Sequence, residues 1–328
     1  MLIVHFTDPH ITSSTPEHPS PRKFRRGSYE DDVFGKLKWI ADYVGQLSIE
    51  TSEPIVLWNT GDTFDRPRES LRTTLRFAQW VKSLPESVYY FTTIGQHDIV
   101  GYSLPTYGEC SIGILDYLPR VYGVDYPYEN DIMGLGAERR SFPYASLHIG
   151  VGHLLTTSNP KEIRGSRVVG THLDIHPNAY GCVAPKDIHW EDARLVLCAH
   201  IHQGFSACEH NGTWFSAPGA LVRLNADELV RQPQISVIRL TSDLDVENIE
   251  YVPVPSRPAE EVFDLAAIEN SATAEAKRTE FRDTITAIEA QRVSGQGVVE
   301  DWREALERMR SEVGDEVVSK LMEYCERT

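Results

Sequence analysis

The residues of this sequence best suited to chemistry stand in five short polar motifs, each following a predicted strand. In chain order the motifs read DPH at 8–10, GDTFD at 61–65, GQHD at 95–98, GH at 152–153 and AHIH at 199–202. Any one of them alone is more often a structural pair than a reactive site. Five successive strand ends that all supply Asp, His or amide groups are hard to obtain by accident. We therefore expect them to converge on one site.

The residue types in these motifs favour a site for two metal ions. Carboxylate oxygens and neutral imidazole nitrogens suit Mn²⁺, Fe²⁺ or Zn²⁺, and the absence of Cys from the motifs disfavours a closed structural zinc site. Side chains alternate along an extended chain, so the outer residues of DPH and of HIH can each face one side. Two cations about 3.5–4 Å apart repel each other and need a shared carboxylate between them. We expect Asp62, on a turn led by glycine, to be that bridge.

The elements that must position these motifs follow from the hydrophobic pattern. Short apolar runs bounded by turn residues predict buried strands, and apolar residues at 3–4 spacing between them predict helices. We expect strands at 2–6, 54–58, 88–94, 145–152 and 194–198, and helices along the apolar stripes from Val33 to Leu47 and from Leu71 to Val81. This alternation predicts a layered α/β domain with its functional loops at strand ends.

The pattern of predicted elements changes from about residue 213. TWFSAPG, QISVIRL and VENIEYVPV predict successive strands that complete a second sheet, and the Pro-rich run at 253–258 predicts a linker. Two helical stretches follow, at about 259–291 and 298–327, the second with an apolar stripe that begins at Trp302. We therefore expect a catalytic domain at 1–255 and a helical region at 256–328.

Composition narrows the function classes. The chain has 328 residues, 41% hydrophobic and 24% charged, as in soluble globular proteins. A net charge of −16 disfavours nucleic-acid binding by the whole surface, but Arg22, Lys23, Arg25 and Arg26 form a local basic patch. That patch is either a solvated loop or a contact to a DNA backbone. No apolar run is long enough for a membrane span, the first residues read as a strand rather than a signal peptide, and five scattered Cys without CxxC spacing favour a reducing compartment.

Taken together, the five motifs resemble those of the calcineurin-like metallophosphoesterase superfamily, which run DxH, GDxxD, GNH(D/E), a strand-end His and GHxH. The segment SAPGALVRL at 216–224 is similar to the PGS-x-x-R segment of SbcD-type nuclease subunits of double-strand-break repair complexes, particularly phage-like members. The resemblance covers about residues 1–255. It implies an α/β fold, a layered metallophosphoesterase β-sandwich flanked by helices, with the C-terminal helical region as an appendage. Ala199 replaces the Gly of GHxH, which is tolerable if its backbone is not at positive φ.

The resemblance also implies roles for individual residues. The first metal would be held by Asp8, His10, Asp62 and His202, and the second by Asp62, Gln96, His153 and His200. His97 would lie beside the scissile phosphate as the catalytic residue. Asp98 would be its orienting partner.

Four assignments keep an alternative. Gln96 stands where the family has Asn, so its longer side chain either folds back onto the second metal or has lost that role. His172 is the alternative to His153, because it too follows a short apolar pair. Asp65 either caps a helix or accepts a hydrogen bond behind a ligand. Arg223 either contacts the substrate phosphate or forms a structural salt bridge.

The function implied by the resemblance is that of a metal-dependent DNA exonuclease and endonuclease acting in repair or recombination. Two divalent ions, Mn²⁺ first and Mg²⁺, Fe²⁺ or Zn²⁺ as alternatives, would hold the hydroxide that attacks phosphorus. Partners would be DNA, an SbcC-type SMC-like ATPase bound by the C-terminal helices, and a second copy of the chain, in the cytoplasm or, for a phage protein, the host cytoplasm. Two other functions stay open: a small-molecule or protein phosphoesterase, and a non-catalytic scaffold. The C-terminal stripe can also pack on its own domain.

Overall fold

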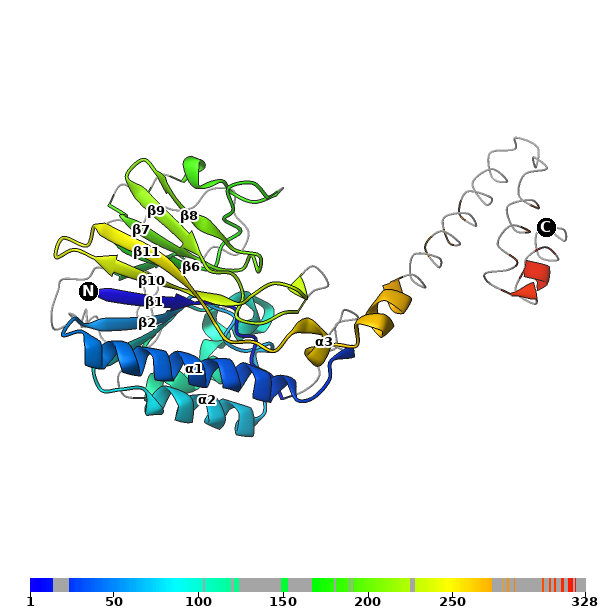
Figure 1. Ribbon diagram of the computed structural model, residues 1–328, viewed down its shortest axis with the longest axis horizontal. Coiled ribbons are helices and arrows are strands. Elements are labelled where there is room, and N and C mark those ends of the chain that lie inside the picture. The colour runs from blue at the N-terminus through cyan, green and yellow to red at the C-terminus, as the bar shows by residue number, and fades with distance from the viewer. Residues whose placement is uncertain are drawn as a thin grey trace. The chain divides into compact units, whose positions relative to one another are not determined.

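The computed structural model describes residues 1–13, 24–102, 104–118, 121–123, 149–152, 167–179, 181–188, 190, 192–224 and 228–272, with scattered positions beyond 272. The chain divides into two units, Met1–Phe263 and Asp264–Thr328. The first unit contains two sheets and two long helices (Figure 1). No helix in the described part of the chain is long and apolar enough to cross a bilayer.

The first sheet has six strands in the order β11-β10-β1-β2-β3-β4. These strands are β1 Leu2–Phe6, β2 Ile55–Asn59, β3 Val88–Thr92, β4 Val121–Gly123, β10 Gln234–Leu240 and β11 Val246–Pro253. β1 to β4 run parallel, whereas β10 is antiparallel to both β1 and β11. β1 therefore lies inside the sheet, and all five of its residues are buried.

The second sheet has five strands in the order β5-β6-β7-β9-β8. They are β5 Ile149–Gly152, β6 Val168–Thr171, β7 Leu195–Cys198, β8 Phe205–His210 and β9 Thr213–Ala217. All pairs are parallel except β8 with β9. The sequence did not predict β6, because its four residues include a glycine and the apolar run is too short to stand out.

One prediction about the sheets is wrong. QISVIRL and VENIEYVPV form β10 and β11 in the first sheet rather than the second, and only β9 joins the second sheet. The physical reason is that β2 pairs with only one edge of the buried strand β1, so the other edge needs a second partner. β10 covers its other edge, from Leu2 opposite Arg239 to His5 opposite Ser236.

Helix α1, Tyr29–Glu50, and helix α2, Leu71–Ser83, cover one face of the first sheet (Figure 1). Each begins at a serine, Ser28 or Ser70, whose hydroxyl accepts a backbone N–H of the first turn. The predicted stripe of α1 is buried at Val33, Phe34, Leu37, Ile40 and Val44 and partly buried at Ala41 and Leu47. The stripe predicted for α2 is partly wrong, because Leu71 is 70% exposed and Leu75 is 44% exposed. The larger Phe77 and Trp80, with Thr73 and Thr74, take the buried face instead.

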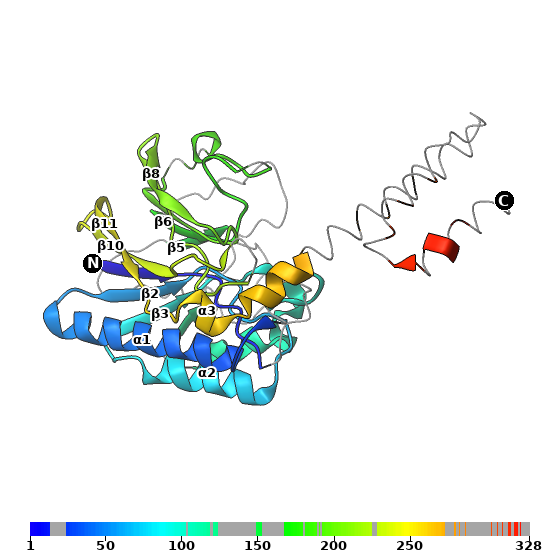
Figure 2. The same ribbon diagram turned by 45° about the vertical axis from the view of Figure 1, so that its right-hand side comes forward.

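The other face of the first sheet packs against the second sheet (Figure 2). Alternation along β1 sends Leu2, Val4 and Phe6 towards the helices and Ile3 towards the second sheet. At the centre of the interface Trp58 of β2 lies against Gly170 of β6, where an added Cβ would come within 2.6 Å of the indole. The predicted β-sandwich with flanking helices is confirmed.

The chain leaves β11 at Pro253 and forms the short helix α3, Ala259–Val262, and then a helical segment at 265–272. The linker predicted at 253–258 precedes α3. Most of the predicted C-terminal helices, including the stripe from Trp302, lies outside the described residues, as do 145–148 of the fourth predicted strand.

Candidate metal centre

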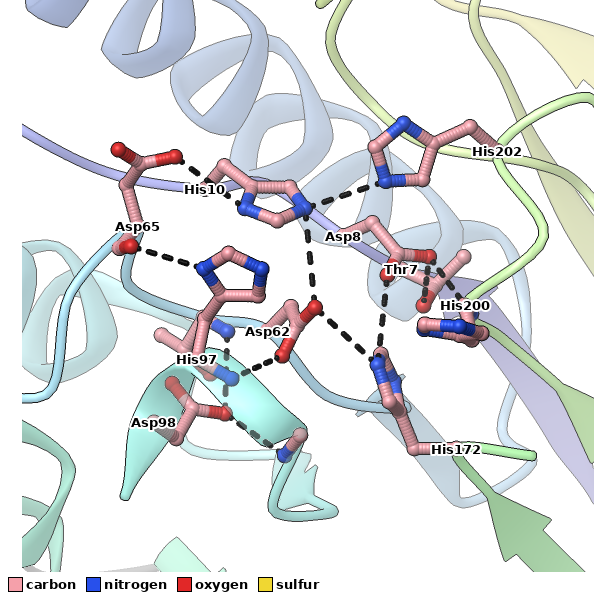
Figure 3. A network of polar contacts seen from close by, with 12 residues as sticks. Thr7, Asp8, His10, Asp62, Asp65, His97, Asp98, His172, His200 and His202 are labelled. Atoms are coloured by element: carbon pink, nitrogen blue, oxygen red, sulfur yellow. Dashed lines mark hydrogen bonds and ion pairs between the residues drawn. The ribbon is translucent and has the colours of Figure 1, made fainter. Parts of the chain in front are cut away.

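Loops from both sheets meet at one place (Figure 3). The parallel strands of each sheet end at the same edge, and functional loops of α/β folds gather at such edges. The side chains that follow these ends are Asp8 and His10 after β1, Asp62 after β2, His97 after β3, His172 after β6, and His200 and His202 after β7. The prediction that the motifs converge is therefore met for the described residues.

Three groups of three side chains have potential ligand atoms within 4.8 Å of one another. One of them is His10, Asp65 and His97. The other two, which we take as the two metal sites, are Asp8, His10 and His202, and Asp62, His172 and His200. Asp62 lies between them, because its Oδ2 is 3.1 Å from His172 Nε2 and 3.7 Å from His10 Nε2. A carboxylate in this position suits two neighbouring cations.

Asp8 presents one carboxylate oxygen to the site. Thr7 Oγ1 and the backbone N–H of His200 donate to Oδ2, at 2.8 and 3.2 Å. Oδ1 is buried and has no hydrogen-bond partner among the described residues. An unsatisfied buried carboxylate oxygen is costly, so Oδ1 fits the role of a cation ligand.

Asp62 is held in the same way. The backbone N–H of His97 donates to Oδ1 at 2.8 Å, which leaves Oδ2 facing the imidazoles of His172 and His10. Burial raises the pKa of Asp62, but the imidazoles of His172, His10 and His97 outweigh burial and hold the pKa well below its usual range. The carboxylate is ionised at neutral pH, as a metal bridge must be.

His172 occupies the position that the sequence offered to either His153 or His172. Its Nδ1 donates to the carbonyl of Thr60 at 3.0 Å, and Nε2 faces Asp62 and Asp8. Burial lowers the pKa of His172, but the carboxylates of Asp62 and Asp8 raise it to about 10. His153 lies outside the described residues. β5, which precedes it, ends at the same edge, one strand farther from β7.

Each imidazole of the cluster turns one nitrogen to an acceptor of the protein and leaves the other for the centre. The contacts are His10 Nδ1 to Asp65 Oδ1 at 3.4 Å, His97 Nδ1 to the Asp65 carbonyl at 2.9 Å, His172 Nδ1 to the Thr60 carbonyl at 3.0 Å, His200 Nε2 to Asp174 Oδ1 at 2.8 Å and His202 Nδ1 to Glu228 Oε1 at 2.8 Å. This arrangement is typical of histidines that bind metals.

Asp65 lies behind His10, where its Oδ1 is 3.4 Å from Nδ1, and its predicted role as an acceptor stays a prediction. The cap of α2 is Ser70. The sequence offered no motif for Asp174 or Glu228, which lie outside the five motifs. Their roles emerge only from the fold.

His97 lies half-buried beside the two groups, with its ring against that of His10 at a centroid distance of 4.9 Å. Because a carbonyl can only accept, the bond to Asp65 places a proton on Nδ1 of His97. Nε2 is left to take up or release a proton. The predicted catalytic role of His97 stays a prediction.

Asp98 contacts backbone amides rather than the His97 ring. Its carboxylate accepts from the N–H groups of Thr63, Phe64 and Gly95, at 3.2, 3.0 and 2.9 Å. Burial and the charge of Asp62 raise the pKa of Asp98 to about 7 against these three donors. Asp98 thus joins the GDTFD and GQHD loops, and it positions His97 through the backbone.

Two motif glycines are required by close packing. A Cβ on Gly95 would lie 2.1 Å from Asp62 Oδ1, and a Cβ on Gly61 would lie 2.5 Å from His172 Nδ1. Gly61 also has a φ of 118°, in the region that favours glycine. The glycines allow the neighbouring loops to place Asp62 and His172 in contact.

Gln96 begins the short 3₁₀ turn Gln96–Asp98 and is half-buried. Its side chain makes no hydrogen bond to the described residues. Its predicted ligand role stays a prediction.

Four site residues have left-handed backbones despite carrying side chains. The φ angles are 49° for Asp8, 42° for His10, 46° for Asp62 and 70° for His200, whereas Ala199 is not in this region. Such conformations cost about 1–3 kcal/mol each and persist where the surroundings impose them. Their concentration at ligand candidates indicates a functional site, and the Ala in AHIH is compatible with the family pattern.

These residues fit a pair of divalent metal ions. The centre offers buried carboxylate oxygens and imidazole nitrogens, the orphaned Asp8 Oδ1 among them, and no sulfur. This donor set suits Mn²⁺, Fe²⁺ or Zn²⁺.

The structure describes two of the four residues of the predicted basic patch, and these two differ in burial. Arg25 has 8% of its side chain exposed, pairs with Asp32, and lies over the rings of Tyr29 and Phe263. Arg26 donates to the Glu260 carbonyl at the surface. Both therefore hold the segment around α3, while Arg22 and Lys23 lie outside the described residues.

Arg223 is buried and donates to the carbonyls of Leu229 and Arg257, at 2.9 and 2.7 Å. Burial lowers the pKa of Arg223. These contacts are structural, and they close the loop that follows SAPGALVRL.

A match to a known protein family agrees with this geometry. The family described as calcineurin-like phosphoesterase matches residues 1–204. No curated protein matches the chain. A solved archaeal phosphodiesterase is 13% identical, with a TM-score of 0.35, and the match covers 77% of this chain and all of that one.

Two solved proteins of Thermus thermophilus also match. The sulfate thiohydrolase SoxB, in complex with glycerol, is 14% identical with a TM-score of 0.44 and 83% of this chain covered. A 5′-nucleotidase precursor from the same species is 13% identical with a TM-score of 0.40 and 85% covered. The chain spans 59% of the length of each.

The fold and the centre define a metal-dependent phosphoester hydrolase. The chain belongs to the calcineurin-like metallophosphoesterase family.

Proposed function

We propose that this protein is a metal-dependent phosphodiesterase that cleaves DNA, with two Mn²⁺ ions as its cofactors. The observation that carries the hydrolytic part is the position of Asp62 between the two groups of ligand candidates. The first ion would be held by Asp8, His10, Asp62 and His202, and the second by Asp62, His172, His200 and the Gln96 amide.

Two ions bound here would supply charge neutralisation at the phosphate and a nucleophile at neutral pH. The protein contributes orientation. Thr7 and the His200 amide turn Asp8 Oδ1 inward, and the His97 amide turns Asp62 Oδ2 inward.

His97 is the proton donor in this proposal. Its Nδ1 is held by the Asp65 carbonyl, so the protonated ring would deliver the Nε2 proton to the leaving oxygen of the ester. The developing alkoxide would leave as a neutral hydroxyl group. Asp98 keeps the loop of His97 in register with the loop of Asp62 through its three amide contacts.

DNA is proposed as the substrate because SAPGALVRL resembles the corresponding segment of SbcD-type nucleases. A role in repair or recombination, in the cytoplasm or a host cytoplasm, follows from the same resemblance. Arg22, Lys23 and Arg26 are the basic residues proposed to approach the DNA backbone.

The test uses the full chain, Mn²⁺ and end-labelled linear duplex or single-stranded DNA. We expect shortened products that EDTA abolishes. His97→Ala should lower the rate by about 10²–10⁴-fold, the usual contribution of a general acid, while His210→Ala on β8 should not. Intact DNA together with hydrolysis of nucleotides or phosphoproteins would replace the DNA proposal by the phosphoesterase alternative. Normal DNA cleavage by His97→Ala and Asp62→Asn would refute the site.

The second unit, Asp264–Thr328, is proposed to bind an SbcC-type SMC-like ATPase. Its support is the separation of this unit from the catalytic one and the helical start at 265–272. Co-purification of the chain with a co-expressed ATPase, lost on deletion of 264–328, would support the proposal. Unchanged co-purification after the deletion would contradict it, and the mass of the free protein would test the proposed homodimer.

A further inference from the structure

Glu228 lies outside the five motifs yet contacts the centre. It is 1% exposed, and its Oε1 lies 2.8 Å from Nδ1 of His202. Its other oxygen, Oε2, accepts the backbone N–H of Leu224 at 2.5 Å. The carboxylate is therefore held between the His202 imidazole and the Leu224 amide.

The two contacts constrain where protons lie. A carboxylate oxygen accepts, so the short contact places a proton on Nδ1 of His202. In the neutral ring Nε2 is then left with its lone pair. That atom points into the centre, 3.2 Å from Nε2 of His10 (Figure 3).

Glu228 differs from the other acceptors behind the histidines. His97 and His172 use backbone carbonyls, which no side-chain substitution removes. Asp174 behind His200 is 48% exposed, and Asp65 lies 3.4 Å from His10. Among these acceptors behind the histidines, Glu228 is the side-chain carboxylate that combines full burial with a contact of 2.8 Å.

The loop between β9 and β10 explains how Glu228 arrives there. Gly219, at φ 79°, lets this loop pass close to the carbonyl of His202, where a Cβ would come within 2.6 Å. The amide of Ala220 donates to the same carbonyl at 3.0 Å. Arg223 then closes the loop on Leu229, next to Glu228.

We propose that Glu228 is a positioning residue that selects the Nδ1–H tautomer of His202 and so prepares Nε2 to bind one of the two metal ions. This inference rests on the metal-dependent function proposed above and names a residue that controls one half of its centre. Partners of this kind typically change metal affinity 10–100-fold.

Glu228→Gln gives a sharp test because it preserves the side-chain volume and reverses the direction of the hydrogen bond to His202. The amide of Leu224 needs an acceptor, so the Gln oxygen must face it. The Gln NH₂ group then faces His202 and donates to Nδ1. His202 would carry its proton on Nε2, the atom that must bind the metal.

The first readout is the ¹⁵N spectrum of histidine-labelled, metal-free protein, with His202 assigned by its loss in His202→Asn. At a pH high enough for the ring to be neutral, we expect a protonated Nδ1 in the wild type and a protonated Nε2 in Glu228→Gln. The second is calorimetric titration with Mn²⁺, in which one of two sites should weaken by about 10–100-fold. Glu209→Gln, an exposed change on β8, is the matched control and should alter neither readout.

An unchanged His202 tautomer in folded Glu228→Gln, or two unchanged metal affinities, would overturn the proposal. If that variant does not fold, Glu228→Asp replaces it: the shorter carboxylate withdraws from His202, and the same single site should weaken. Neither readout requires DNA or catalysis. If both readouts behave as expected but the protein leaves DNA intact, the proposed function fails and the role of Glu228 stands.

Discussion

The imidazole of His172 joins the two sheets at the centre, with Nε2 3.1 Å from Asp62 Oδ2 and Nδ1 3.0 Å from the carbonyl of Thr60. His172 follows β6 of the second sheet, whereas Thr60 and Asp62 follow β2 of the first. The Thr60 carbonyl holds Nδ1 by a hydrogen bond, and Nε2 faces Asp62. The geometry of the centre therefore depends on how the two sheets pack.

Replacing His172 by Ala should remove a ligand of the second ion. We expect one of the two Mn²⁺ affinities to fall by at least about tenfold, with loss of hydrolysis, because the imidazole faces Asp62 directly. Calorimetry with Mn²⁺ measures both sites. His153→Ala should leave both affinities unchanged. The opposite pattern, with His153 required and His172 dispensable, would return the ligand role to His153.

The metal-free protein should lose stability as pH rises from about 7 to 10. His172 has its pKa raised from 6.5 to about 10 in the fold, so it binds a proton more strongly when folded than when unfolded. Its contribution is fully present below the unfolded pKa and is lost as pH rises through the folded one.

Urea unfolding of chelator-treated protein across this pH range measures the effect. His172→Gln should flatten the dependence. A free energy of unfolding that increases with pH between 7 and 10 would contradict the prediction.

Gly95→Ala should disable the centre without touching a ligand. The new Cβ would lie 2.1 Å from Asp62 Oδ1 and 2.2 Å from its backbone nitrogen, so the bridge must move. We expect loss of Mn²⁺ binding and activity. Gly35→Ala, in α1 with no atom within 4 Å, is the control, and it should stabilise the helix by about 0.5–1 kcal/mol. Equal effects of the two changes on metal binding would argue against the packing explanation.

Gln96 is expected to tune the second metal site. Removing its amide in Gln96→Ala should lower the affinity for one ion and the activity, whereas Gln96→Asn restores the residue usual in the family and should raise that affinity. Manganese titrations and DNA cleavage at low Mn²⁺ compare the variants. Unchanged stoichiometry and activity in Gln96→Ala would show that the ligand role is lost.

Arg25→Ala should reduce stability rather than DNA affinity. The side chain is buried between Asp32, Tyr29 and Phe263, and Asp32 keeps Arg257 as a partner, so the loss of packing should cost about 0.5–3 kcal/mol. Thermal unfolding measures this loss. Arg26→Ala, at the surface, should leave stability within about 0.5 kcal/mol. Weaker DNA binding by folded Arg25→Ala would instead support the predicted DNA contact.

Much of the centre could be predicted from the sequence because its residues directly follow strands. Asp8, Asp62 and His200 stand at fixed distances from apolar runs, and parallel strands bring such ends to one edge. The sequence left His153 and His172 unresolved, because both follow apolar runs that end at that edge. Only strand order distinguishes them: β6 lies next to β7, whereas β5 is at the sheet margin.

The features of the centre and the fold that the sequence did not predict depend on contacts between segments distant in the chain. Glu228 reaches His202 through a turn whose course depends on close backbone packing at Gly219. Trp58 against Gly170 likewise decides how the sheets face each other. Neither relationship has a local sequence signal. The same holds for β10, whose apolar alternation fits a strand in either sheet.

The place of β1 between β2 and β10 has a consequence for biosynthesis. Leu2 lies opposite Arg239, so β1 acquires its antiparallel neighbour only after the whole segment between them has been translated. At about 5–20 residues per second, the wait is roughly 10–50 s. During that time an apolar strand edge has no intramolecular cover. We expect this uncovered edge to make incomplete chains more prone to aggregation than the finished protein.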